Sequence, residues 1–220
     1  MWLRHCLSCE KRQRFYWCKS CWQNIRSYES PHWSQQLQGG LPCISYTPYQ
    51  ETRQLLYLVK YHGFSELARE SGEHLGRWFL KHWPLPDCII PIPLSQERFQ
   101  ERGFNQSLEL ARGLSQIIRR PVLEALVRAV DTPRLYNQTA EERQRIMEGN
   151  NGQNVFALSP AVQKSPAFLC QKTYLLLDDV LTTGSTMNAA FEALSKISNK
   201  GVGLTFARAD ITDPLDFRSV

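Results

Sequence analysis

Apolar residues recur along the chain at two spacings, which predict alternating helices and strands. Where they return every three or four positions, they mark one face of a helix; short continuous runs bounded by polar or turn residues mark strands. The predicted helices cover residues 64–82, 105–119 and 187–197. The predicted strands cover residues 87–94, 122–130, 155–158, 174–177 and 202–207.

The alternation of strand and helix predicts an α/β fold, with a mainly parallel sheet and helices on both faces. Residues 27–42 are rich in Ser, Gln, Gly and Pro, so we expect a linker there. It would separate a small module at 1–26 from a main domain at 43–220. No apolar run approaches the roughly 18 residues that a membrane-spanning helix requires, so no membrane span is expected.

The composition is that of a globular protein, and its charge is unevenly placed. The chain has 220 residues, of which 42% are hydrophobic and 21% charged, and its formal net charge is +5. Residues 1–26 hold six basic side chains and one acidic one, so this segment carries the whole excess. Such a segment fits contact with nucleic acid or with a protein, or a merely solubilising surface. No secretory signal is visible, and we expect a soluble cytoplasmic protein.

Four of the seven cysteines have metal-ligand spacing: Cys6 and Cys9 form one CxxC pair, and Cys18 and Cys21 form another. Two tight turns that each direct two thiolates to one point complete a tetrahedron, so we predict a structural zinc site. The alternatives are two disulfides, which a cytosolic chain disfavours, and a redox CxxC motif, which is not usually doubled at this spacing. The basic residues around four thiolates also offset the negative charge of the site.

The segment richest in chemistry follows the predicted strand at 174–177 and opens the predicted helix at 187–197. Asp178 and Asp179 come first and could accept hydrogen bonds from vicinal ribose hydroxyls or face a hydrated Mg²⁺. A turn then offers hydroxyls, backbone N–H groups and a helix N-terminus, which together suit a phosphate group. The residues of this turn are Thr182, Thr183, Gly184, Ser185 and Thr186. A ribose 5-phosphate ligand would satisfy both parts.

This segment resembles the phosphoribosyl pyrophosphate (PRPP) motif of type I phosphoribosyltransferases, which have a Rossmann-like, mainly parallel sheet. With the CxxC module, the rest of the chain resembles the ComF family, which includes competence-associated and GntX-like proteins. The supporting segments, in the order of the family, are LVKYHG at 58–63, IPIP at 90–93, ERGFNQS at 101–107, Gln138 and residues 151–156.

The resemblance implies roles for further residues. Arg102 and Gly103 correspond to the loop that faces pyrophosphate, where the Arg102 guanidinium could pair with phosphate oxygens. Asp178, Asp179 and Arg102 would form the catalytic set, with Mg²⁺ arriving together with PRPP. Lys60 is either a structural stem or a phosphate contact. Residues 131–154 resemble a lid over the active site or form a long loop, and carry Arg134, Gln138, Arg143 and Arg145.

For function, the resemblance implies a phosphoribosyltransferase-like protein of natural transformation, acting in the uptake or processing of single-stranded DNA beside a helicase-like ATPase. The alternatives are a nucleobase phosphoribosyltransferase of salvage metabolism and a PRPP-sensing regulator without catalysis. Purine-salvage relatives of this fold have an Asp at the position of Thr182, and a threonine has no useful pKa for base chemistry. Enzymatic turnover, and the acceptor it would need, stay open.

Overall fold

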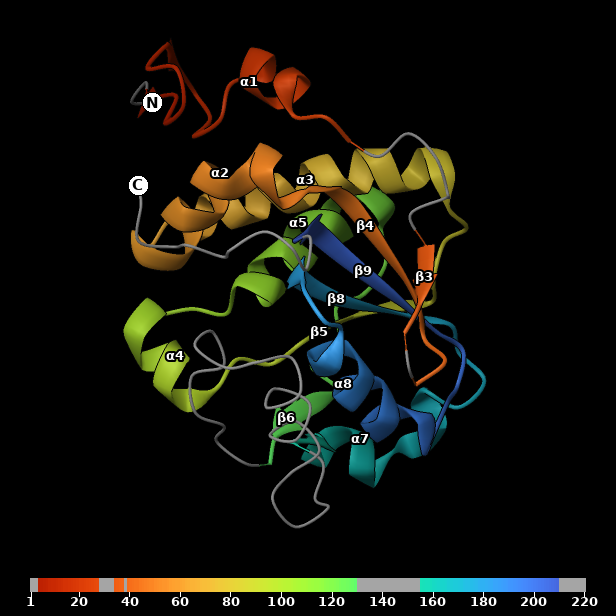
Figure 1. Ribbon diagram of the computed structural model, residues 1–220. Coiled ribbons are helices and arrows are strands. Elements are labelled where there is room, and N and C mark those ends of the chain that lie inside the picture. Colours follow the sequence, from red (N-terminus) through yellow and green to blue (C-terminus); the bar gives the residue numbers. More distant parts are fainter. Residues whose placement is uncertain (1–3, 28–33, 38, 130–154, 210–220) are drawn as a thin grey trace.

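A five-stranded, mainly parallel sheet forms the centre of the molecule (Figure 1). The computed structural model describes residues 4–27, 34–37, 39–129 and 155–209. The strand order is β3-β4-β9-β8-β5, with β4, β9, β8 and β5 parallel to one another and β3 antiparallel at the edge. The strands are β3 (Ser34–Gln36), β4 (Pro42–Pro48), β5 (Cys88–Pro91), β8 (Tyr174–Leu181) and β9 (Gly201–Arg208).

Helices cover both faces of this sheet and bury a separate apolar cluster on each side. On one face lie α2 (Tyr49–Tyr61), α3 (Ser65–His82) and α5 (Gln106–Ile118). On the other lie α8 (Ser185–Ser195), α7 (Pro160–Lys164), the 3-10 turn η2 (Pro166–Phe168) and the antiparallel pair β6 (Leu126–Arg128) and β7 (Phe156–Leu158). The predicted α/β class, a parallel sheet with helices on both faces, is confirmed.

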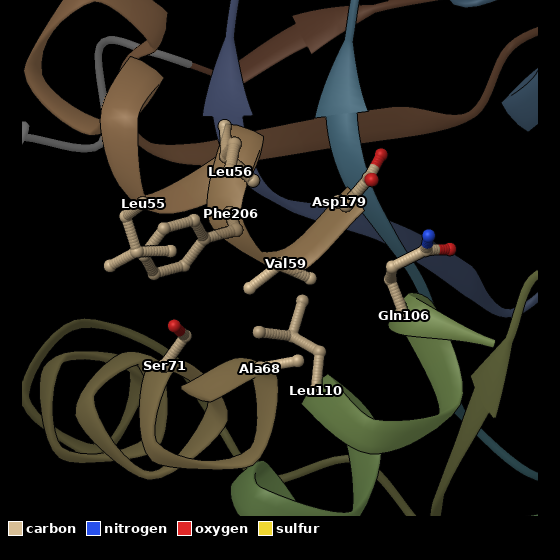
Figure 2. A pocket seen from close by; sticks show the side chains of 9 residues that line it. All are labelled: Leu55, Leu56, Val59, Ala68, Ser71, Gln106, Leu110, Asp179 and Phe206. Carbon is tan, nitrogen blue, oxygen red and sulfur yellow. The ribbon is translucent and has the colours of Figure 1, made fainter. Parts of the chain in front are cut away.

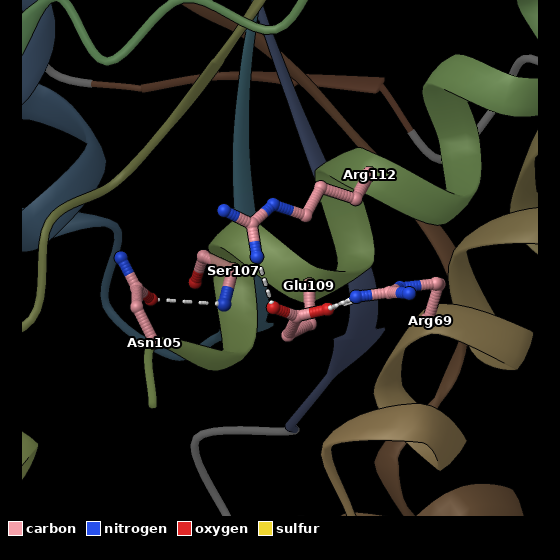
Figure 3. A network of polar contacts seen from close by, with 5 residues as sticks. All are labelled: Arg69, Asn105, Ser107, Glu109 and Arg112. Atoms are coloured by element: carbon pink, nitrogen blue, oxygen red, sulfur yellow. Dashed lines mark hydrogen bonds and ion pairs between the residues drawn. The ribbon is translucent and has the colours of Figure 1, made fainter. Parts of the chain in front are cut away.

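Helices α3 and α5 approach each other at backbone distance because glycines lie at their contact. A Cβ atom placed on Gly72 would lie 2.0 Å from the Leu110 carbonyl oxygen, and one on Gly113 would lie 1.9 Å from that of Arg69. Beside this contact the buried Glu109 carboxylate of α5 pairs with Arg69 of α3 and with Arg112 (Figure 3). Close packing and this ion pair together fix the position of α5 against α3.

The cysteine-bearing segment packs onto the main domain rather than standing apart from it. It contains β1 (Arg4–His5), β2 (Arg12–Gln13) and α1 (Lys19–Asn24), and it lies over α2 and α3 (Figure 1). Trp22 stacks on His74 of α3 at a ring-centroid distance of 4.5 Å. The Glu70 carboxylate accepts hydrogen bonds from the backbone N–H groups of Tyr16 and Trp17. The division at residues 26 and 43 therefore stays a prediction about domains, although the two parts share one core.

The structure refines several predicted elements. The predicted helices at 64–82 and 105–119 correspond to α3 and α5, while the strand predicted at 174–177 continues to Leu181. Within the predicted linker, residues 34–36 form strand β3, and Leu37 and Leu41 are buried, so this part of the segment belongs to the sheet. The strand predicted at 122–130 is reduced to β6 and one bridge between Val122 and Ile89. Strand β4 and helix α2 were not predicted.

Across the part of the chain that the structure describes, no helix combines the length and the apolarity that crossing a bilayer would demand.

Candidate functional site

The candidate site lies at the carboxyl end of β8, close to the centre of the sheet. In α/β proteins this edge is where ligands bind, because loops and helix N-termini converge there. Asp178 and Asp179 lie within the second half of β8, not in the loop after it. Consecutive strand residues point to opposite sides, so the two carboxylates meet different neighbours.

The Asp179 carboxylate is held by cations from other elements. Lys60, in the last turn of α2, places its Nζ 3.0 Å from Asp179 Oδ2, and both side chains are largely buried. Burial alone would raise the pKa of Asp179, but the charges of Lys60 and Arg102 outweigh it and lower the pKa. Asp179 therefore stays ionised at neutral pH. The sequence left the role of Lys60 open; the structure shows it as the ion-pair partner of Asp179.

The Asp178 carboxylate is held by hydrogen bonds rather than by an ion pair within the described residues, and its pKa is shifted in the opposite direction. The Ser107 hydroxyl donates to Asp178 Oδ1 at 2.8 Å, and the backbone N–H of Asp179 donates to the same atom at 2.9 Å. Burial, followed by the neighbouring Asp179 charge, raises the pKa of Asp178 to about 6. The pair thus combines one firmly ionised carboxylate with one that gains a proton in mildly acidic solution.

The turn between β8 and α8 has the form expected of a phosphate cradle. Gly184 adopts a left-handed conformation, with φ of 82°, and precedes the first residue of α8. The Thr183 and Ser185 hydroxyls lie 3.0 Å apart, and Thr183 Oγ1 accepts a hydrogen bond of 3.4 Å from the Ser185 N–H at the start of α8. Thr182, Thr183, Ser185 and Thr186 are partly exposed. Partly exposed hydroxyls and the N–H groups at a helix N-terminus attract anions.

Arg102 lies at the C-terminal end of α4 (Gln96–Arg102), the helix that follows β5. Gly103 ends the helix in a left-handed conformation, with φ of 75°. Burial lowers the pKa of Arg102, while the charge of Asp179 acts in the opposite direction. Its guanidinium therefore belongs to the same electrostatic environment as the acidic pair. The structure thus brings the predicted Arg102, Asp178, Asp179 and the 182–186 turn to one edge of the sheet.

The first turn of α5 supplies residues that the sequence reasoning missed. Ser107 binds Asp178, and Asn105 fastens the turn by accepting from the Ser107 N–H and donating to the Ile92 carbonyl at 3.0 Å. Gln106 is buried beside Asp179. All three lie in the ERGFNQS segment, so its run of amides and hydroxyls before a helix was the signal available. Predicted lid residues Arg134, Gln138, Arg143 and Arg145 lie outside the described residues.

The four paired cysteines converge on a second site. The sulfur atoms of Cys6, Cys9, Cys18 and Cys21 all lie within 4.8 Å of one another. Cys18 N–H donates to Cys6 Sγ at 3.3 Å and Cys21 N–H to Cys18 Sγ at 3.4 Å. Such N–H donors stabilise thiolates, which are the form that binds metal. The cluster could hold a tetrahedral ion such as zinc, and the cysteines Cys43, Cys88 and Cys170 stand outside it.

The search of protein-family models gave no match. Solved structures of low similarity include adenine phosphoribosyl transferase from Trypanosoma brucei, with a TM-score of 0.40 and 12% identity over 90% of this chain and 84% of that one. Glutamine PRPP amidotransferase from Bacillus subtilis has a TM-score of 0.37 and 12% identity, over 64% of this chain and 25% of that one. These scores are too low to carry weight, and the fold class rests on the strand order described above.

Curated relatives are more informative. Competence protein F of Haemophilus influenzae is 34% identical over 116 residues, which cover 51% of this chain and 46% of that protein. DNA utilization protein YhgH of Escherichia coli O6:H1 is 38% identical over 47% of this chain and 40% of the relative. Competence protein ComFC of Bacillus subtilis is 27% identical over 68% of this chain and 55% of that protein. The matches thus span about half the length of each relative. These relatives, at 27–38% identity, support the assignment of the chain to the ComF family.

Proposed function

We propose that the chain binds PRPP with Mg²⁺, or a related ribose 5-phosphate ligand, at the carboxyl end of β8. One observation carries this proposal: the acidic pair Asp178–Asp179 directly precedes the Gly184 turn, while Lys60 and Arg102 face the pair from other elements. The site therefore offers acceptors for sugar hydroxyls next to donors for a phosphate group, and cations for a second, larger anion.

Each part of the ligand has a matching part of the site. The 5-phosphate would take the N–H groups and hydroxyls of residues 182–186, and the ribose hydroxyls would donate to Asp178 and Asp179. The pyrophosphate would lie near Arg102, with Gly103 as its neighbour, where the guanidinium can form two parallel hydrogen bonds. The carboxylate oxygens of Asp178 and Asp179 are also donor atoms that suit Mg²⁺, which shields diphosphate charge when bound.

The same arrangement supports phosphoribosyl transfer as the activity to test first. In that reaction the bond between ribose C1 and pyrophosphate breaks, pyrophosphate leaves with the electron pair, and an acceptor nitrogen bonds to C1. Asp178 and Asp179 would stabilise the positive charge that develops on the sugar. Thr182 does not supply a general base, so the acceptor has to arrive without a proton to lose, or lose it to water. A PRPP sensor would use the binding step alone.

Titration calorimetry with Mg²⁺-PRPP tests the binding proposal. We expect wild-type protein to bind and the Asp178→Asn/Asp179→Asn double variant to lose binding by at least 100-fold, because two ionised acceptors are removed. Glu124→Gln removes one exposed carboxylate that is not among the proposed site residues and serves as the control. A double variant that binds like wild type would overturn the proposal. Pyrophosphate release in the presence of individual nucleobases then separates an enzyme from a sensor.

We propose in addition that the four-cysteine cluster holds zinc and that the chain acts in the uptake or processing of single-stranded DNA. The exposed side chains of the zinc module favour this role: Lys11, Arg12, Arg14 and Lys19 are exposed, Phe15 is 51% exposed, and the Arg14 guanidinium lies 5.8 Å from the Phe15 ring centroid. Basic side chains with an exposed aromatic ring suit phosphate contact and base stacking. The relatives named for competence and DNA utilization agree with it. A helicase-like ATPase would be the protein partner, in the reducing cytoplasm that free thiols suit.

Single-stranded DNA binding at several salt concentrations tests this second role. The Arg12→Glu/Arg14→Glu/Lys19→Glu variant should bind at least tenfold more weakly, with a shallower salt dependence, because phosphate contacts are lost. The control variant, Lys81→Glu/Arg119→Glu/Lys164→Glu, reverses three exposed charges outside the module. Equal losses in both variants would show a general effect of net charge and would count against a DNA site on the module.

A further inference from the structure

Gln106, the first residue of α5, has a buried side-chain amide. Its side chain is 2% exposed, and among the described residues Nε2 has no hydrogen-bond partner. A buried donor without a partner costs stability, and native proteins keep few such groups. A hydrophobic residue would suit this position better if packing were its only purpose. The unpaired amide therefore points to a role in ligand binding.

The position of the Gln106 backbone is well defined. On either side of it, Asn105 is bonded to the Ile92 carbonyl and to the Ser107 N–H, and the Ser107 hydroxyl is bonded to Asp178. Figure 3 shows Asn105 and Ser107 at the start of α5, next to Glu109, which the two arginines hold. The unpaired amide thus belongs to an anchored turn, so local fraying does not explain it.

Gln106 lines a narrow crevice between α2, α3, α5, β8 and β9, whose other walls are mostly aliphatic or aromatic (Figure 2). Besides Gln106, two of its lining side chains carry acceptor atoms, Ser71 and Asp179. The Ser71 hydroxyl donates to the Leu67 carbonyl at 2.8 Å and lies at the far end of the crevice in Figure 2. Asp179 lies at the same end as Gln106.

We propose that Gln106 is a positioning residue for Asp179 in the ligand-bound state. In the described structure Lys60 holds Asp179 through Oδ2. When sugar hydroxyls draw the carboxylate away from Lys60, Gln106 Nε2 donates to it and fixes its new orientation, while Lys60 becomes available to the phosphates. This inference rests on the proposed function, since it describes how the same site changes when a ribose 5-phosphate ligand arrives. It adds to the proposed site one residue, Gln106, and a second position of the Asp179 carboxylate.

We expect Gln106→Leu to raise the melting temperature and to weaken the binding of ribose 5-phosphate. Leu has a similar volume and no donor, so the ligand-free variant should melt a few degrees higher than wild type. Its affinity for ribose 5-phosphate should nevertheless fall about tenfold, because Asp179 loses its partner in the bound state. Affinity for inorganic phosphate, which needs only the 182–186 turn, should not change. A residue with a purely structural role would lower the melting temperature and all affinities together.

Sugar selectivity supplies the second measurement. Wild type should prefer ribose 5-phosphate to 2-deoxyribose 5-phosphate, and Gln106→Leu should reduce this preference several-fold, because a poorly oriented Asp179 no longer reads the hydroxyls. Gln106→Met, which is unbranched and of equal length, should reproduce both effects and covers the case in which Leu does not fold. A variant that keeps the wild-type preference, or that loses stability, overturns the role of Gln106. If wild type itself binds neither sugar phosphate, the proposed function fails instead.

Discussion

Lys60 Nζ lies 3.0 Å from Asp179 Oδ2 and joins the C-terminal turn of α2 to strand β8. Both side chains are largely buried, at 11% and 17% exposure, so the pair is poorly screened by solvent. The site therefore contains a cation for one of its carboxylates. A ligand that uses Asp179 must compete with Lys60, and a diphosphate can offer Lys60 a new partner in exchange.

We expect Lys60→Met to destabilise the chain and to weaken PRPP binding. Asp179 would keep a largely buried charge without its closest cation, which costs about 2–3 kcal/mol of unfolding free energy. Denaturant unfolding measures this loss. The Lys60→Met/Asp179→Asn double variant should recover most of the stability, because it no longer buries the charge. Equal stabilities of Lys60→Met and wild type would show that the ion pair contributes nothing.

The raised pKa of Asp178 predicts a pH dependence of stability. Because burial and Asp179 raise this pKa from 3.8 to about 6, the folded chain binds a proton more readily than the unfolded chain between these values. The contribution of Asp178 to stability is therefore greatest below pH 4 and is lost as pH rises through 6. Relative to Asp178→Asn, wild type should lose ~1–2 kcal/mol between pH 4 and pH 7. Parallel pH profiles of the two proteins would contradict this.

Ligand affinity should depend on pH in the opposite direction. Ribose hydroxyls donate best to an ionised carboxylate, so binding of ribose 5-phosphate should strengthen from pH 5 to pH 7 as Asp178 loses its proton. The ligand phosphate also titrates near pH 6. Asp178→Asn serves as the control, since it keeps the phosphate titration and removes that of the carboxyl group. The difference between the two profiles isolates Asp178, and identical profiles would remove it from the site.

Metal removal should lower the stability of the whole chain and not of the module alone. Trp17, Trp22 and Ile25 belong to the same apolar cluster as the sheet and α3, so disorder around the four cysteines exposes part of that core. We expect a strong chelator, or Cys9→Ser, to lower the melting temperature by several degrees. Cys170→Ser changes an exposed cysteine outside the cluster and is the control. An unchanged melting temperature after complete zinc loss would contradict the coupling.

Periodicity predicted those elements in which the apolar residues gather on one face or form one continuous run. Helix α3 shows a regular row of buried positions, and the apolar run at 174–177 predicted strand β8. Strand β4 and helix α2 were missed because Pro48 joins them directly, with no polar turn between the two patterns. Residues 34–41 looked like a linker by composition, yet Leu37 and Leu41 bury themselves against the sheet. Composition reports average polarity and cannot show that two leucines in a polar segment pack against the sheet.

The site was predictable where its residues are contiguous. Asp178, Asp179 and the 182–186 turn follow each other in the chain, so their chemistry can be recognised in one segment. The contacts of Lys60 and Ser107 with the acidic pair arise from packing of α2 and α5 against β8, and no local pattern contains that information. Gln106 is harder still, because its significance lies in a hydrogen bond that the described structure does not supply.

A side chain at Gly184 should destabilise the chain for two reasons, a left-handed backbone and a clash with Leu37. Gly63 has only the first of these features, so comparing the two glycines separates the two effects. Gly184 has φ of 82°, and a Cβ there would lie 2.7 Å from Leu37 Cδ2; Gly63 has φ of 73° with open space around it. Gly63→Ala should therefore cost only the backbone strain, about 1 kcal/mol. Gly184→Ala adds the clash, so we expect a loss at least twice as large and phosphate binding at least tenfold weaker, because the turn must shift. Unfolding and phosphate titration of both variants test this. Equal stability losses would mean that Leu37 yields easily, and unchanged phosphate binding in Gly184→Ala would place the anion elsewhere than on the 182–186 turn.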